Sequence, residues 1–316
     1  MISQERTLAF LLGSYIADAA SLGLHWIYDP EQIADRIRTS GGTAAFQPPG
    51  RDHYHGMKAV GDMTQYGEST RVLHQSLLRT GGKLDLEDYQ KGFIAHFGPG
   101  GGYKGYIDKP TRITLENLVQ GQVDPSGADD DQNPAASKLP PLVLTALSNN
   151  TDFRGEIEKA VRVTNNNDNA VHYAQIVAAA LRATLSEGEL SAGLEAGMAE
   201  AENQAGNEAK ALINEALTTN NTDSISIAGH FGRACSLHQS IPTAFHILTH
   251  TDNYQAAIEL NIMAGGDSAG RAPFIGAMMG AAHGIGTEKG IPLNWLVKMS
   301  HGNRLISESE ALYNIV

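Results

Sequence analysis

Residues 265–284 read GGDSAGRAPFIGAMMGAAHG, a Gly-Gly turn and an acid followed by a run of small and apolar residues. The pattern predicts a turn that presents Asp267 at the start of a helix thin enough to pack closely against a neighbour. A carboxylate in this place can cap the helix or line a ligand or metal site. Ala269 and Gly270 follow, so the turn offers no second carboxylate. We expect a pocket here whose metal chemistry is weakened.

Helical periodicity dominates the rest of the chain. Apolar residues recur at steps of three and four from Leu8 to Ala19, which gives one apolar helix face. No series of alternating Val, Ile and Thr runs indicates a sheet. We therefore predict an all-α fold, with residues 1–316 forming a single compact multi-helix domain. Further helices are expected at 72–77, 142–147, 170–185, 190–201, 208–217, 227–237, 244–248, 254–263 and 273–282.

Three long segments lack this periodicity, namely residues 39–68, 98–111 and 121–140. Loops of this length inside a compact domain are usually functional or disordered. Aromatic residues among the glycines of the first two favour function, because disordered segments are poor in them. Gly100, Gly101 and Tyr103 of the second loop are candidate ligand-binding residues.

Composition limits the classes of partner. The formal net charge is −12, which disfavours non-specific binding to nucleic acid or to an anionic membrane. The single cysteine, Cys235, excludes an intramolecular disulfide and is expected to act as a small buried residue. The N-terminus lacks the features of a signal peptide, and the apolar runs are expected to fall short of a membrane span. We expect a cytoplasmic protein that binds neither nucleic acid nor membrane.

Polar side chains gather in two segments near the N-terminus. Asp18 lies within an apolar helical stretch, where a carboxylate must be paired or hydrogen-bonded. His25 follows at the end of that stretch and, alone, is more often structural than catalytic. In residues 61–70, Asp62 stands three residues before Gln65, which fits a capping box. Taken alone, capping is the favoured interpretation of both Asp62 and Asp267.

A third polar segment, residues 164–170 (TNNNDNA), precedes a predicted helix. Such runs are ordinary turn and capping chemistry, and they can also line a polar pocket. Asn165 is therefore a candidate ligand-binding residue.

In this order, the segments resemble the signatures of the ADP-ribosylglycohydrolase family. Residues 17–25 (ADAASLGLH) look like the family's opening Gly-Asp-Ala-Leu-Gly-x-Pro-x-Glu segment, and residues 61–64 (GDMT) stand in place of its Thr-Asp-Asp-Thr. Residues 164–167 (TNNN) occupy the place of Thr-His-x-His, and residues 265–270 (GGDSAG) that of Gly-Gly-Asp-Thr-Asp-Thr. Order and spacing hold from about residue 7 to residue 285. Residues 24–29 (LHWIYD) resemble the divergent branch of the J1-crystallins and selenoprotein J.

The resemblance implies a central cleft that, in active relatives, holds two Mg²⁺ ions between the second and last signatures. Carried over by position, Asp62 and Asp267 remain as metal ligands, and Thr64 supplies a further oxygen. His25 stands where the family has a glutamate that handles substrate or water. Hard cations need several oxygen ligands each, so we expect magnesium to bind weakly or not at all.

Two interpretations of function remain open. In the first, Asp62, Asp267 and His25 hydrolyse an N- or O-glycosidic bond of an ADP-ribosyl or related ribosyl ligand, a small molecule or an ADP-ribosylated substrate. In the alternative, the scaffold is a non-catalytic ligand-binding or structural protein, as in the crystallins. Its oligomeric state stays open. The candidate ligand-binding residues are Asp18, Thr64, Gly100, Gly101, Tyr103, Asn165 and Ser268.

Overall fold

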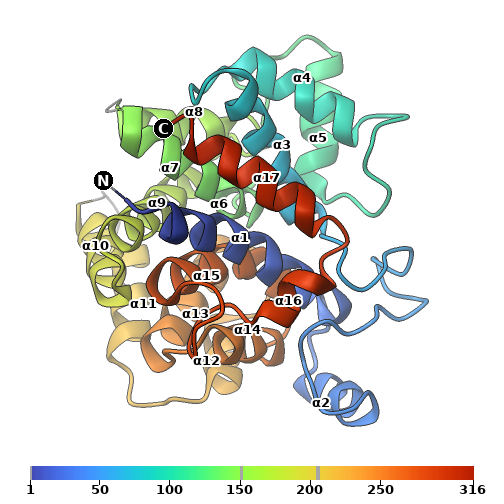
Figure 1. The fold of residues 1–316 in the computed structure, drawn as a ribbon, viewed down its shortest axis with the longest axis vertical. Coiled ribbons are helices and arrows are strands. Elements are labelled where there is room, and N and C mark those ends of the chain that lie inside the picture. The colour runs from blue at the N-terminus through green and yellow to red at the C-terminus, as the bar shows by residue number, and fades with distance from the viewer. Residues whose placement is uncertain (1, 150–151, 204–206) are drawn as a thin grey trace.

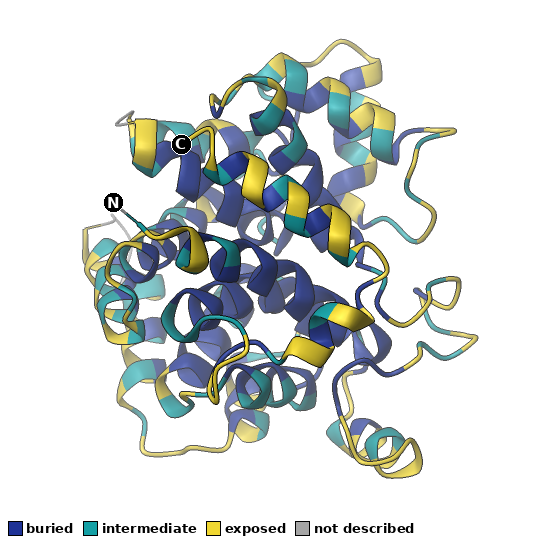
Figure 2. Ribbon diagram, viewed as in Figure 1, coloured by how far each residue is buried: buried dark blue, intermediate teal, exposed yellow. Residues whose placement is uncertain are grey.

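Two helices pack side by side at the centre of the molecule. Helix α1 (Gln4–Ser21) packs along α15 (Ser268–His283), and both are almost wholly buried (Figures 1 and 2). A Cβ atom added to Gly276 would lie 2.2 Å from the carbonyl oxygen of Gly13, so the two backbones touch at this point. The prediction that small residues allow close helix contact is confirmed.

The computed structural model describes residues 2–149, 152–203 and 207–316. Within these ranges the chain forms seventeen α-helices and a short 3-10 helix, and it has no β-strand, which confirms the all-α prediction. Besides α1 and α15, the elements are η1 (Leu22–Leu24), α2 (Pro30–Thr39), α3 (Gln65–Arg79), α4 (Leu86–Phe97), α5 (Lys109–Val119), α6 (Pro134–Ser137), α7 (Leu139–Asn149), α8 (Phe153–Arg162), α9 (Asp168–Glu187), α10 (Leu190–Glu202), α11 (Asn207–Thr218), α12 (Ser224–Phe231), α13 (Leu237–His250), α14 (Tyr254–Met263), α16 (Leu293–Lys298) and α17 (Gly302–Tyr313).

The central pair α1 and α15 divides the remaining helices into two groups. In Figure 1, α3, α4, α5 and α7 lie above α1, and α11 to α14 lie below it. The long loop between α2 and α3 runs along one side of the molecule. Segments that are far apart in the sequence therefore meet near the middle of the molecule: the C-terminal end of α1 and the N-terminal ends of α3 and α15.

Helix α1 and the adjoining η1 are longer than the apolar runs suggested. Residues Gln4–Leu24 form a helical segment that is long and apolar enough to cross a membrane. However, 94% of its apolar 18-residue stretch is buried inside the protein. A buried core helix passes the same test of length and composition. This segment packs as the centre of the core.

Most of the expected helices are present, but one is wrong. The stretch 227–237 was expected to be one helix, whereas α12 ends at Phe231 and α13 begins at Leu237. Gly232 separates them with a φ of 102°, a conformation that ends a helix and that glycine adopts without strain. The segments 98–111 and 121–140, expected to be loops, contain the start of α5 and the whole of α6. Asp108 caps α5 through the amide of Thr111.

Candidate functional site

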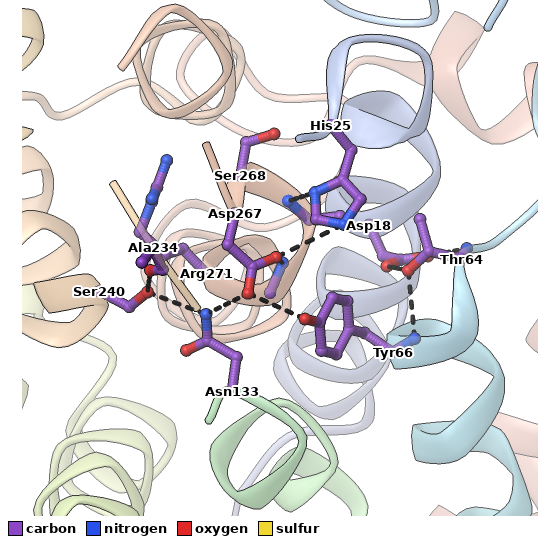
Figure 3. A network of polar contacts seen from close by, with 12 residues as sticks. Asp18, His25, Thr64, Tyr66, Asn133, Ala234, Ser240, Asp267, Ser268 and Arg271 are labelled. Atoms are coloured by element: carbon purple, nitrogen blue, oxygen red, sulfur yellow. Dashed lines mark hydrogen bonds and ion pairs between the residues drawn. The ribbon is translucent and has the colours of Figure 1, made fainter. Parts of the chain in front are cut away.

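Asp267 is the centre of the candidate site. It caps α15 through the amide of Gly270, and its side chain is 0% exposed. The hydroxyl of Tyr66 and the side-chain amide of Asn133 both donate to its Oδ2, each over 2.8 Å (Figure 3). These donors come from the starts of α3 and α6, so the carboxylate joins three helices.

His25 faces the same carboxylate from the end of η1. The backbone amide of Ala269 donates to its Nδ1 over 3.2 Å, so the proton of a neutral ring resides on Nε2. That Nε2 lies 3.4 Å from Oδ1 of Asp267, an ion-pair distance that is too long and misaligned for a good hydrogen bond. Burial, followed by the nearby His55 and His53, holds the pKa of His25 well below its usual value. His25 therefore presents a neutral N–H to Asp267.

Burial acts on Asp267 in the opposite sense to its donors. Desolvation raises the pKa of the Asp267 carboxyl, while the bonds from Asn133 and Tyr66 and the cation of Arg271 partly counter the increase. Arg271 is itself fully buried and donates to the oxygens of Asn261 and Gly265. It thus holds the Gly-Gly turn and supplies a fixed positive charge one helical turn from Asp267.

Asp18 and Thr64 form a second buried pair that fixes the start of α3. The amide and the hydroxyl of Thr64 both donate to Asp18, and Thr64 Oγ1 accepts from the amide of Tyr66. Gly67 lets the carboxylate approach, because a Cβ there would lie 2.5 Å from Asp18 Oδ2. Burial raises the pKa of Asp18 to about 7. This pair positions Tyr66, whose hydroxyl in turn donates to Asp267.

Asp62 forms its hydrogen bonds with residues outside the group around Asp267. Its Oδ1 accepts from the hydroxyl of Ser300 over 2.6 Å and its Oδ2 from the amide of Ala59 over 2.8 Å. Gly61 lies against the chain at Lys298, where a Cβ would come within 1.9 Å of the carbonyl oxygen. This contact turns Asp62 toward α16, and no hydrogen bond joins it to Asp267.

The donor set does not fit a pair of magnesium ions in this arrangement. Both oxygens of Asp62 are occupied by bonds within its own surroundings, and Oδ2 of Asp267 already accepts two. Among the residues that the structure describes, no group of three or more His, Cys, Asp or Glu side chains could hold a metal ion. Each Mg²⁺ needs a nearly octahedral set of oxygens, which these side chains do not provide.

The remaining candidates are spread around the site. Ser268 follows Asp267, and its buried hydroxyl has no hydrogen-bond partner. Asn165 is buried and donates to the carbonyl oxygen of Asp130, so it holds the loop before α6. Gly100 and Gly101 form a turn after α4, while Tyr103 packs against Phe97 with 5.2 Å between ring centroids. These glycines make no contact with Asp267 and stay predictions.

Sequence reasoning missed several polar residues that surround Asp267. Tyr66 and Asn133 bond to it directly. Tyr66 stood inside the segment 61–70, but an aromatic at the second position of a helix carries no special signal. Asn133 immediately precedes Pro134. That start signal for a helix could have drawn attention to it.

Comparisons of the whole chain with known proteins agree with the observed fold. Two curated relatives come from Tripedalia cystophora: Crystallin J1A is 28% identical over 98% of this chain and 97% of its own length, and Crystallin J1B is 25% identical over 99% and 98%. A solved structure described as an ADP-ribosylglycohydrolase-related protein complex superposes with a TM-score of 0.74, covering 99% of this chain and 98% of its own at 20% identity, which shows the fold. The sequence model of ADP-ribosylglycohydrolase matches residues 2–315. The chain therefore belongs to the ADP-ribosylglycohydrolase family.

Proposed function

We propose that this protein hydrolyses a glycosidic bond at the anomeric carbon of an ADP-ribosyl or related ribosyl ligand, with Asp267 as the acting carboxylate. The observation that carries the proposal is the buried Asp267 itself. It is oriented by hydrogen bonds from Tyr66 and Asn133 and faces His25, in a member of this family. Its ligand is a small molecule or an ADP-ribosylated substrate, met in the cytoplasm.

The chemistry follows from the carboxylate. Glycosidic cleavage develops positive charge at the anomeric carbon, and a fixed carboxylate stabilises it. The bond from that carbon to the leaving atom breaks, and its electron pair goes to the leaving atom. The oxygen of a water molecule forms the new bond to carbon, and its proton passes to Asp267. His25 is not the general acid, because its Nδ1 accepts from the amide of Ala269 and burial lowers its pKa, which keeps the ring neutral.

We further propose that the reaction proceeds without a magnesium pair. Support comes from the separate bonding of Asp62 and Asp267 and from the absence of a three-residue ligand group among the described residues. The buried cation of Arg271 provides a positive charge near Asp267 that does not depend on added metal.

The test is the release of ribosyl product from ADP-ribosyl substrates by the purified chain, together with the thermal shift caused by ADP-ribose. Both are measured with Mg²⁺ and with EDTA. We expect hydrolysis and a thermal shift that EDTA leaves unchanged, and we expect Asp267→Asn to abolish hydrolysis. Asp252→Asn, at an exposed acid paired with Lys289, is the matched control that keeps activity. Activity that requires Mg²⁺ would overturn the metal-independent part.

The non-catalytic alternative has one structural observation in its favour, since His25 and Asp267 are both 0% exposed. A protein of this kind would release no product and show no thermal shift with ADP-ribose under either condition. Asp267→Ala would then affect stability alone.

A further inference from the structure

Four aromatic side chains connect the candidate site to the surface, and we call them the aromatic cluster: Trp26, Tyr54, His55 and Tyr106. The ring centroid of Trp26 lies 5.2 Å from those of Tyr54 and Tyr106, and the two tyrosines are 5.0 Å apart. His55 stacks on Trp26 at 5.4 Å. Tyr54 is 62% exposed, so the cluster reaches solvent at this end.

The inner end of the cluster touches the residues around Asp267. The ring centroid of Trp26 is 4.1 Å from that of His25, whose Nε2 is 3.4 Å from Asp267 Oδ1. A flat group held by the cluster would therefore stand next to the reacting carbon. It would be the group attached directly to the anomeric carbon, because the far end of a long diphosphate ligand would lie well away.

Trp26 is held in place by a strained backbone. Its φ is 59°, a left-handed conformation that a bulky residue rarely adopts. Two hydrogen bonds maintain it: Trp26 N donates to Gly266 O over 2.8 Å, and Gly266 N donates to Ile27 O over 2.7 Å. These two bonds hold the backbone of Trp26 against Gly266, the residue that precedes Asp267.

His55 provides the observation that points to a ligand. It is 0% exposed, and neither of its ring nitrogens has a hydrogen-bond partner. Buried polar groups in native proteins are nearly always hydrogen-bonded. The two nitrogens of a neutral imidazole, one donor and one acceptor, suit an amide substituent on a ring that enters beside Trp26.

The residues around Asp267 also limit the leaving group. The Nδ1 of His25 accepts from the amide of Ala269 and its Nε2 lies 3.4 Å from Asp267 Oδ1, so neither ring nitrogen is free to protonate a leaving atom. A leaving group that is already cationic needs no such proton. Aromatic ring faces attract cations.

We propose that the aromatic cluster is a specificity site for a planar, positively charged nitrogen heterocycle of the pyridinium type, bonded to the anomeric carbon. This inference rests on the proposed function. In the step, the carbon–nitrogen bond breaks and its electron pair neutralises the departing ring. Water supplies the new oxygen to carbon, and its proton passes to Asp267. Tyr54, the outermost and most exposed ring, forms the solvent side of the site.

The experiment uses the N-methylnicotinamide cation as the probe and measures quenching of indole fluorescence in the full chain. We expect saturable binding that Tyr54→Ala and Tyr106→Ala each weaken about fivefold or more, as the loss of a cation–π contact predicts. Tyr313→Ala, on the last turn of α17, is the matched control and should bind like the wild type. Neutral nicotinamide should bind more weakly than the cation. Failure to bind the cation, or wild-type affinity in both cluster variants, would overturn the inference.

Hydrolysis separates this inference from the proposed function. Release of ribosyl product from an ADP-ribosyl substrate without binding of the cation leaves the function standing and removes the pyridinium specificity. Binding of the cation to the aromatic cluster, with no hydrolysis of an N-ribosylpyridinium substrate that depends on Asp267, retains the binding site and removes the proposed function.

Discussion

The hydroxyl of Tyr66 donates to the carboxylate of Asp267 over 2.8 Å, and this bond ties the start of α3 to the start of α15. The two residues are separated by 201 positions in the sequence, and both are fully buried or nearly so. Because Thr64 caps the helix of Tyr66 and bonds to Asp18, the position of Asp267 depends on α1 and α3 as well as on its own turn.

Tyr66→Phe should destabilise the protein by about 1.5–3 kcal/mol, the usual contribution of a hydrogen bond to a charged group. The variant leaves Asp267 with one donor fewer in a buried place. Tyr173→Phe is the matched control, because the Tyr173 hydroxyl is buried and has no hydrogen-bond partner. Its removal should be neutral or stabilising. Denaturant unfolding of the two variants measures the difference, and equal costs would contradict the assignment.

Asp18 should make stability depend on pH. Burial raises its pKa from 3.8 to about 7, so between these values the folded protein holds a proton that the unfolded chain releases. Its contribution to the free energy of unfolding is therefore full below pH 4 and is lost as the pH rises to 7. Asp18→Asn does not titrate, so the stability of the wild type relative to this variant should fall from pH 4 to pH 7. A constant difference in urea unfolding over that range would show that Asp18 is ionised throughout.

The sequence was sufficient to predict the all-α fold and several individual residues of the site. It could not predict which of these residues contact one another. The small residues after Asp267 and the turn before it are local signals, and they predict the closely packed helix and the capping acid correctly. The partner of Asp62 depends on how the chain at Lys298–Ser300 docks against Gly61, a long-range contact that no spacing encodes. For the same reason, sequence could not place Tyr66 and Asn133 beside Asp267.

Close contact between α1 and α15 predicts that Gly276→Ala is severely destabilising. The added Cβ would lie 2.2 Å from Gly13 O and 2.5 Å from the Cβ of Ala17, so both helices must separate. Gly229→Ala provides the control on α12, because its Cβ would meet only the end of the Arg233 side chain, at 3.2 Å. Alanine there should be neutral or stabilise the helix by up to about 1 kcal/mol. Thermal unfolding of the two variants measures the difference in melting temperature. A mild effect of Gly276→Ala would mean that α1 and α15 lie farther apart than described.

Lys138 should give a second pH dependence, opposite in direction to that of Asp18. Its ammonium group is fully buried on the short link between α6 and α7 and donates to the hydroxyl of Thr164. Burial lowers its pKa from 10.5 to about 7, although the Asp108 carboxylate partly opposes this. Between pH 7 and pH 10.5 the unfolded chain therefore binds a proton that the folded protein has released. Stability should rise with pH across that window, and the contribution is lost as the pH falls through 7.

Lys138→Met keeps the length of the side chain and removes the titration. The wild type should therefore gain stability relative to Lys138→Met from pH 7 to pH 9.5 in urea unfolding. Lys83→Met, at an exposed lysine, controls for the loss of one charge. A wild type that shows no gain over Lys138→Met would mean that the buried amine keeps its proton, and Asp108 would then be its ion-pair partner.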